Sequence, residues 1–322
     1  MTFGVEIETA GPENPTEVLA LALGGEVVRP MEPQPPLIIS RFGTWASVPD
    51  DSIERTEAHP CGREFVSPVF RHTPEDIAKV GAVVAALGSS GFTATGANCG
   101  LHVHVGVGDR ARDPELILAA LALSYEWSRV IHLLLRDRRL ASAFCEAHNA
   151  WFLSSFAGFY SGRLPPTYQR VMRRLIGEDP RKVGPTSDKL ELPRNFGVNL
   201  TALAIHGTIE YRFFEGTLDP ALVAAYVELC VRFTALVLES RPRLRAQRKP
   251  TVASMEALLD LLGVTAESRA VLLTDEVRAH ARGLATHTPI ATLRLDLSLL
   301  DEESRRLARR ALALAGRAPW LA

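Results

Sequence analysis

Two histidines stand one residue apart in the apolar run GLHVHV, at positions 102 and 104. Side chains alternate between the two faces of a β-strand, so His102 and His104 would point to the same face. Imidazole is a common metal ligand, whereas a purely structural buried strand would carry Val or Ile at such positions. The pair therefore indicates a metal or other polar site, and two surface histidines on a solvated strand are the alternative.

The same polar-apolar-polar spacing occurs in two other segments that read as strands. Glu6 and Glu8 flank an isoleucine, and Glu210 and Arg212 flank a tyrosine. If the three strands share a sheet, their six polar side chains lie on one face, and Glu64 in the segment REFVSP adds a further acid. The opposite face would then carry apolar side chains that pack under helices: Val5, Ile7, Leu101, Val103, Val105, Ile209 and Tyr211.

This polar face suits the chemistry of a metal and a phosphate. Carboxylate oxygens favour hard cations such as Mg²⁺ or Mn²⁺, which commonly sit between carboxylates and substrate phosphates. A guanidinium such as that of Arg212 offers a planar fork of donors that matches phosphate oxygens. The set therefore predicts a metal–nucleotide site for phosphoryl transfer. The chain has no G-x-x-x-x-G-K-[ST] loop, so it would not be a P-loop enzyme.

The elements that would position these residues alternate unevenly between strands and helices. Strands are expected at 3–9, 97–107, 196–203 and 207–216, and a hairpin contains TWASVPDDSI. Helices are expected at 15–23, 74–88, 114–145, 166–177 and 220–239, the second opened by Thr73 and Pro74. Without a regular βαβ rhythm, the pattern predicts an α+β fold with a largely antiparallel sheet backed by helices.

The pattern changes after residue 240. Amphipathic helices are expected near 252–262, 266–283 and 301–315, with Leu-rich faces opposite Arg-rich faces. We therefore predict a catalytic domain at 1–240 and a C-terminal helical appendage at 241–322 that could make the protein a homo-oligomer.

Composition narrows the classes of partner. The formal net charge is −1 at pH 7, which argues against nucleic acid or an anionic membrane surface as a partner. The four cysteines form no C-x-x-C pair, and the acidic start MTFGVEIE is unlike a signal peptide. We expect no membrane span, which would need a run of about 20 apolar residues. We expect a cytoplasmic protein.

The motifs together resemble the amidoligase family, the carboxylate–amine ligases of the glutamine synthetase and glutamate–cysteine ligase type. The resemblance extends over about residues 3–220 and leaves the C-terminal third outside it. It rests on six segments in the family's order: FGVEIE at 3–8, W-x-S-V-x-D-D-S-I at 45–53, EFVSP at 64–68, CGLHVHV at 99–105, VNL at 198–200 and TIEYRFFEGTLD at 208–219.

The resemblance implies a glutamine synthetase-like domain, whose curved sheet holds metals on its concave face, and a role for each matched residue. The implied metal ligands are Glu6, Glu8, Glu64, His102 and Glu210. His104 would contact the nucleotide, and Arg212 would meet the transferred phosphate. Glu64 would also contribute to cofactor binding, and Glu210 with Arg212 to catalysis.

The implied reaction uses ATP and Mg²⁺ or Mn²⁺ to join a carboxylate to an amine through an acyl phosphate. The substrates would be small molecules or peptides. Asp51 is assigned a catalytic role and Ser52 a substrate contact, although Asp50 competes with Asp51 for the same motif position. Asn98, Arg170 and Arg174 are further candidate substrate contacts, and a solvated basic face is the alternative for the two arginines.

Two other classes of function remain open at this stage. A metal-dependent amide hydrolase can also use an H-x-H strand, but it would need further histidine ligands in a (β/α)₈ barrel and would leave the two glutamate-containing strands without a role. A non-catalytic nucleotide-binding protein of the same fold would be expected to lack an acid or the arginine at a matched position, and none is missing.

Overall fold

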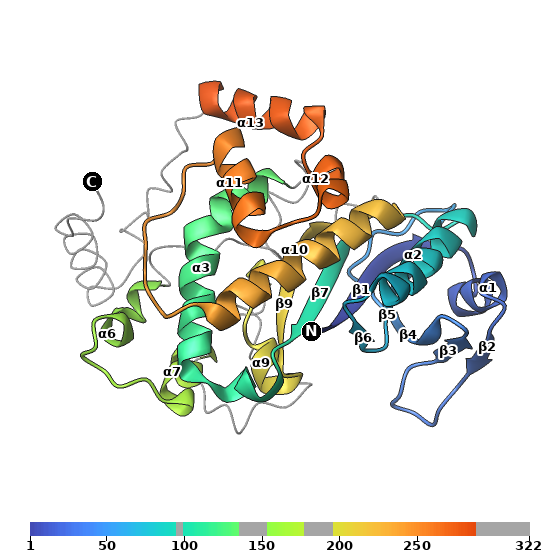
Figure 1. Ribbon diagram of the computed structural model, residues 1–322. Helices are drawn as coiled ribbons and strands as arrows, with labels where there is room; N and C mark the ends of the chain where they lie inside the picture. The colour runs from blue at the N-terminus through green and yellow to red at the C-terminus, as the bar shows by residue number, and fades with distance from the viewer. Residues whose placement is uncertain (95–98, 135–152, 177–195, 288–322) are drawn as a thin grey trace, which may run out of the picture.

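One nine-stranded sheet organises the protein (Figure 1). In the computed structural model, residues 1–94, 99–134, 153–176 and 196–287 are described. Every pairing among the described strands is antiparallel, which confirms the predicted α+β class. The order across the sheet is β2 (Glu26–Val28), β3 (Leu37–Ser40), β4 (Gly43–Pro49), β5 (Cys61–Val66), β1 (Thr2–Gly11), β7 (Gly100–Gly106), β9 (Thr208–Glu215) and β8 (Val198–Asn199), while β6 (Phe70–Arg71) pairs with β1.

The four strands predicted to carry the polar residues are neighbours, in the order β5, β1, β7, β9. Their register sets Glu8 opposite Glu64 and Glu6 opposite His102. It also sets His104 opposite Glu210. The polar side chains therefore lie side by side on one face of the sheet, as the alternation of the strands predicts.

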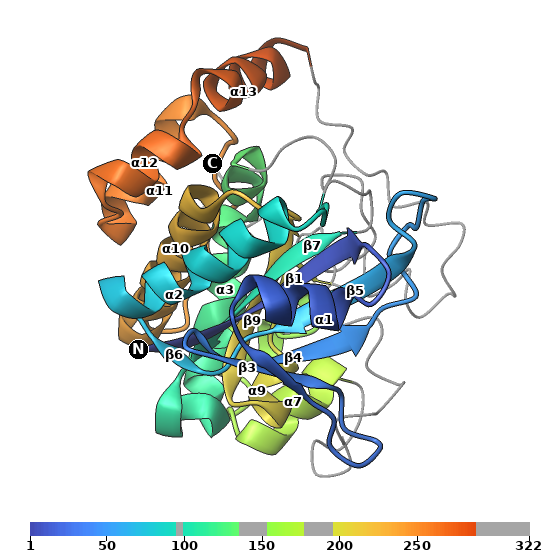
Figure 2. The same ribbon diagram turned by 90° about the vertical axis from the view of Figure 1, so that its right-hand side faces the viewer.

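Three long helices cover the other face: α2 (Pro74–Ser89), α3 (Pro114–Leu133) and α10 (Pro220–Glu239). Figure 2 shows α2 and α10 crossing the same side of the sheet. Each begins with a side-chain cap followed by proline, because the oxygens of Thr73, Asp113 and Asp219 accept from free backbone N–H groups of the first turn. Under these helices, Tyr211 of β9 contacts Phe233 of α10 and its hydroxyl hydrogen-bonds to Thr234 at 2.7 Å.

Two predicted elements differ in extent. The strand expected at 196–203 is formed only at Val198–Asn199, and helix α9 (Ala202–Ile205) follows. The cause is local, because the side chain of Asn199 accepts the backbone N–H of Thr201 and turns the chain there. The helix expected at 114–145 is described as far as Leu133, and residues 135–152 lie outside the described part.

Shorter helices complete the first part of the chain. α1 (Pro15–Ala22) packs on β2 and β3, and a 3₁₀ helix, η1 (Gly108–Arg112), precedes α3. α6 (Ala157–Tyr160) and α7 (Tyr168–Ile176) belong to the described part of the poorly patterned region, and α7 matches the helix expected at 166–177.

The C-terminal helices pack on α3 and α10. α11 (Val252–Leu262) matches its prediction, whereas the helix expected at 266–283 is two helices, α12 (Ala266–Leu272) and α13 (Asp275–His287). The break follows from Thr274, whose hydroxyl accepts the backbone N–H of Val277 and starts a new helix. Residues 301–315 lie outside the described part. Met255 and Leu258 of α11 belong to the same hydrophobic core as the sheet, so the predicted boundary near residue 240 does not separate two cores.

Helices α3 and α10 are long and apolar enough to cross a membrane by length and composition, contrary to the expectation from the sequence. In the protein, 78% and 67% of their most apolar windows are buried. Core helices pass the same test, so these two helices are weak evidence for a membrane. Cytoplasmic location stays a prediction.

Candidate functional site

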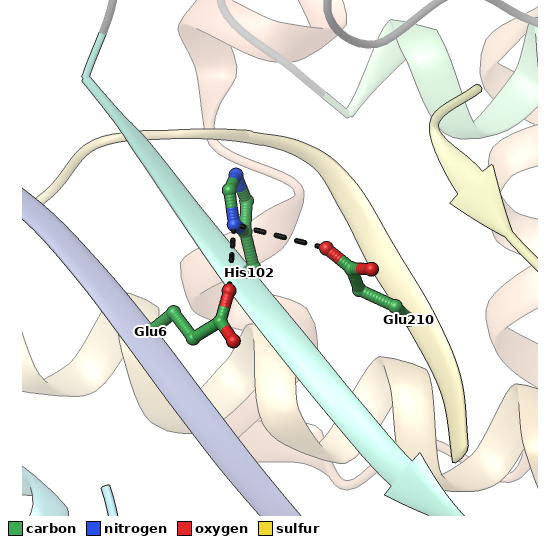
Figure 3. Close-up of side chains that lie close together, drawn as sticks. All are labelled: Glu6, His102 and Glu210. Atoms are coloured by element: carbon green, nitrogen blue, oxygen red, sulfur yellow. Dashed lines mark hydrogen bonds and ion pairs between the residues drawn. The ribbon is translucent and has the colours of Figure 1, made fainter. Parts of the chain in front are cut away.

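His102 lies at the centre of the polar face. Its Nδ1 is 3.0 Å from Glu6 Oε2 and 3.8 Å from Glu210 Oε1. Figure 3 shows these three side chains converging from β1, β7 and β9. Glu6, His102 and Glu210 each direct one ligand atom to the same place, with those atoms within 4.8 Å of one another.

A second group shares the same histidine. His102 Nε2 is 3.4 Å from Glu8 Oε1, and His102 Nδ1 is 3.9 Å from Glu64 Oε1. The other oxygen of Glu8 accepts the backbone N–H of Gly100 at 2.5 Å, which ties β1 to the start of β7. Glu8, Glu64 and His102 form a second set of closely spaced ligand atoms. All five residues predicted as metal ligands thus belong to one of two adjoining groups.

His104 has a hydrogen-bond partner at Nδ1 and two carboxylates beside Nε2. Its Nδ1 is 2.9 Å from the hydroxyl of Thr208, and its ring meets that of His206 edge to face with centroids 5.7 Å apart. Its Nε2 forms ion pairs with Glu6 Oε1 at 3.2 Å and Glu210 Oε1 at 3.8 Å, but it is buried and makes no aligned hydrogen bond to either. An unsatisfied buried nitrogen beside two carboxylates is suited to contact with a bound ligand.

Arg212 occupies an irregular point of β9. The register with β7 shifts between Leu101 and Val103, so Arg212 and Phe213 together face His102. Such β-bulges redirect side chains and are common beside active sites. Arg212 Nη1 donates to Glu210 Oε1 at 2.5 Å, while its buried Nε has no hydrogen-bond partner. The guanidinium thus retains a free donor on the polar face.

The charges on this face are unevenly balanced. Burial alone would raise the pKa of Glu6, yet the positive charge of His104 and the hydrogen bond with His102 lower it well below its ordinary value. Burial, followed by the negative charges of Glu6, Glu8 and Asp50, raises the pKa of Glu64 well above its ordinary value. Among the described residues, this face therefore has more carboxylates than positively charged side chains to balance them.

The donor set fits a divalent cation. Carboxylate oxygens with one or two imidazole nitrogens suit Mg²⁺ or Mn²⁺, and zinc would favour more histidine or cysteine. A cation among these carboxylates would offset the repulsion that raises the pKa of Glu64. The residues that could hold it are Glu6, Glu8, Glu64, His102 and Glu210.

The turn after β4 distinguishes Asp50 from Asp51. Asp51 is exposed and its carboxylate pairs with Arg55, so the structure does not bring it to the polar face. Asp50 is partly buried, its charge contributes to the raised pKa of Glu64, and it accepts from both the N–H and the hydroxyl of Ser52. The charge of Asp50 therefore acts on Glu64, whereas the sequence favoured Asp51 for this motif position, and Ser52 donates two hydrogen bonds to the Asp50 carboxylate.

The structure describes no contact between the polar face and the two arginines predicted to bind substrate. Arg170 and Arg174 are exposed on α7, and Arg170 Nη1 donates to the carbonyl of Pro165 at 3.4 Å. Asn98 lies outside the described residues.

Three neighbours of the site were missed in the sequence analysis: Asn199, Thr208 and His206. Asn199 Nδ2 donates to Glu210 Oε2 at 2.6 Å, and the other two contact the ring of His104. Thr208 and Glu210 share a strand face at two-residue spacing, so an extended reading of the E-x-R pattern could have found Thr208. His206 and Asn199 reach the site through a turn and an edge strand, for which the sequence carries no periodic signal.

Comparison with known proteins agrees with this geometry. A family model described as "Putative amidoligase enzyme" matches residues 1–234, which include every residue of the two ligand groups together with His104 and Arg212. A search of curated proteins finds no match. Because the matched region spans more than half of the chain and contains the whole polar face, the chain belongs to the amidoligase family.

Proposed function

We propose that this protein is a Mg²⁺- and ATP-dependent carboxylate–amine ligase with a glutamine synthetase-like catalytic domain. Mn²⁺ would be an alternative metal. The observation that carries the proposal is the convergence of two carboxylate–histidine groups, an unsatisfied imidazole nitrogen and a guanidinium on one sheet face. Family membership supports ligase chemistry, and the acidic donor set supports a metal-bound nucleotide as the phosphoryl donor.

The reaction has two steps. A substrate carboxylate oxygen attacks the γ-phosphorus of ATP, and the bond to the β-phosphate oxygen breaks to release ADP and leave an acyl phosphate. The amine nitrogen then attacks the acyl carbon, loses a proton and displaces inorganic phosphate, which forms the amide. Bound metal would supply charge neutralisation for the phosphates.

The residues of the chain act by position and charge in this scheme. Glu6, Glu8, Glu64, His102 and Glu210 would hold the metal. Arg212 keeps its charge at all relevant pH values and presents a free Nε donor, which suits the phosphoryl group during transfer. His104 Nε2 is placed to contact the phosphate chain of the nucleotide or its metal. No covalent intermediate with the protein is required.

The substrates are proposed by chemical class. Small molecules or peptides would supply the carboxylate and the amine. Asp50, held by Ser52 and acting electrostatically on Glu64, is a candidate for contact with the amine. Roles for Asp51, Asn98, Arg170 and Arg174, and assembly through the C-terminal helices, stay predictions.

The direct test is phosphate release from ATP with Mg²⁺ across a panel of amino acids, polyamines and peptides, with mass spectrometry of the products. We expect release that depends on both an acid and an amine, and a product lighter than the sum of the two by one water. Amide hydrolysis without nucleotide would support the hydrolase alternative. A chain that neither binds nor consumes Mg-ATP with any acceptor pair would refute the ligase proposal.

A further inference from the structure

Thr201, Asn199 and Glu210 are joined by a buried chain of hydrogen bonds, and the proposed reaction gives no role to Asn199 or Thr201. Asn199 pairs directly with Glu210 across β8 and β9, so both side chains lie on the polar face. The three residues are 2–5% exposed: Thr201 at 2%, Asn199 at 4% and Glu210 at 5%. Groups buried to this degree gain little from solvent, so their mutual hydrogen bonds determine their orientation.

The two carboxylate oxygens of Glu210 have different partners. Oε2 accepts from Asn199 Nδ2 at 2.6 Å. Oε1 accepts from Arg212 and lies 3.8 Å from His102 Nδ1 and 3.8 Å from His104 Nε2. The hydrogen bond to Oε2 therefore limits rotation of the carboxylate and keeps Oε1 directed at the imidazoles.

Thr201 determines which end of the Asn199 amide faces Glu210. The backbone N–H of Thr201 donates to Asn199 Oδ1 at 3.0 Å, and its hydroxyl donates to the same oxygen at 2.6 Å. An amide turned the other way would point Oδ1 at the Glu210 carboxylate and an N–H at the backbone donor, which would lose both interactions. The amide orientation is thus specified by two donors.

We propose that Asn199, oriented by Thr201, is a positioning residue that holds Glu210 in the orientation needed to bind a divalent cation. The inference rests on the proposed metal-dependent function and adds two residues to its machinery. Residues that orient metal ligands typically change metal affinity by about 10- to 100-fold when removed. The VNL segment thereby gains a role that the strand pattern alone does not suggest.

The test is Mn²⁺ binding to the full chain in the absence of nucleotide, measured by electron paramagnetic resonance or calorimetry. We expect Asn199→Ala to weaken Mn²⁺ binding by up to about 100-fold, and Thr201→Val, which keeps the backbone donor, by about 10-fold. Thr201→Ser retains the hydroxyl and should bind within about twofold of wild type. In the turnover assay, the KM for Mg-ATP should rise in the same order.

Thr234→Val is the matched control. Thr234 is also a fully buried threonine whose hydroxyl bonds to a β9 side chain, but it lies on the helix-covered face, with Tyr211 as its partner. Its loss should lower the melting temperature about as much as Thr201→Val does and leave Mn²⁺ affinity unchanged. General damage to β9 would weaken Mn²⁺ binding equally in both variants and would overturn the inference.

The remaining outcomes separate the two proposals. Mn²⁺ binding that is unchanged in Thr201→Val and in folded Asn199→Ala would overturn the positioning role and leave the ligase proposal standing. A wild-type chain that binds no Mn²⁺ would remove the metal site itself, and the positioning role with it. If Asn199→Ala does not fold, the comparison of Thr201→Val with Thr201→Ser decides the question.

Discussion

The two faces of the central sheet are built from the same strands but differ in how well their polar groups are satisfied. On the helix-covered face, Ile7 and Val103 are fully buried, and the one hydroxyl of Tyr211 is satisfied by Thr234. On the polar face, carboxylates stand beside one another, and buried nitrogens of His104 and Arg212 lack hydrogen-bond partners. One face is arranged for stability, and the other tolerates electrostatic conflict that a ligand would relieve.

The contrast predicts that substitutions of neighbouring residues on one strand will have different effects on the protein. A substitution on the helix-covered face should mainly lower the stability of the protein. A substitution on the polar face should mainly lower ligand binding or turnover. The following substitutions test this separation, from the largest expected effect to the smallest.

Arg212→Ala should have the largest effect. It removes the one guanidinium that lies beside Glu210 among the described residues, so charge on the transferring phosphoryl group would be left unbalanced. We expect ATP-dependent phosphate release to fall at least about 10³-fold. Arg212→Lys, which keeps the charge and loses the planar fork, should recover part of this rate. Turnover within about tenfold of wild type in Arg212→Ala would show that phosphoryl transfer does not depend on this face.

Ile7→Ala tests the helix-covered face at the residue between the two glutamates of β1. Ile7 is fully buried in the main core. Its truncation should lower the free energy of unfolding by about 2–5 kcal/mol through lost burial and a residual cavity. Urea denaturation measures this loss, and Mn²⁺ affinity of the folded variant should stay within about twofold. A loss under about 1 kcal/mol would contradict the assignment of this face to the core.

Glu8→Gln, one residue further along, should give the reverse result. The glutamine oxygen can still accept the N–H of Gly100, while one charge leaves a crowded group of carboxylates. Without metal, the free energy of unfolding should fall by no more than about 1 kcal/mol, and an increase is equally consistent with the loss of a repelling charge. The rise in melting temperature on adding Mg²⁺ with a non-hydrolysable ATP analogue should disappear, because that rise reports binding to the native state. A wild-type rise in the variant would count against Glu8 as a ligand.

Glu228→Gln should have the smallest effect and compares a satisfied carboxylate with the crowded ones. Glu228 on α10 accepts from the backbone N–H of Thr265 at 3.0 Å and from its hydroxyl at 2.7 Å, and Arg232 is its charged neighbour. Burial would raise the pKa of Glu228, but hydrogen bonds from Ser268 and Thr265 and the charge of Arg232 outweigh burial and lower it.

The sign of the pH dependence follows from that lowered pKa. Glu228 stabilises the fold above its unfolded pKa, and the contribution is lost as the pH falls through its folded pKa. We expect Glu228→Gln to lose about 1 kcal/mol of unfolding free energy at neutral pH and progressively less in acid, below about pH 4.5. Urea denaturation at several pH values measures this. An equal loss at all these pH values would attribute the effect to packing rather than charge.

Much of the polar face was predictable because alternation along a strand is local. Glu6 and Glu8 share a face of their strand, and so do His102 and His104, whatever the rest of the chain does, provided that each segment is extended. The starts of α2, α3 and α10 were equally readable, since a capping side chain followed by proline acts within one turn. The family motifs were also readable from the sequence, because each is a contiguous segment.

Tertiary structure decided what depends on register and turns. The bulge at Arg212, the different surroundings of Asp50 and Asp51 and the contact of Asn199 with Glu210 each depend on which atoms face one another across strands or loops. Thr208 and His206 meet His104 from about one hundred positions away in the chain, with a sequence separation of 104 for Thr208. Side-chain type and spacing therefore identified the candidate ligands, and long-range pairing specified their orientation, because hydrogen-bond geometry between distant segments leaves no periodic trace in the sequence.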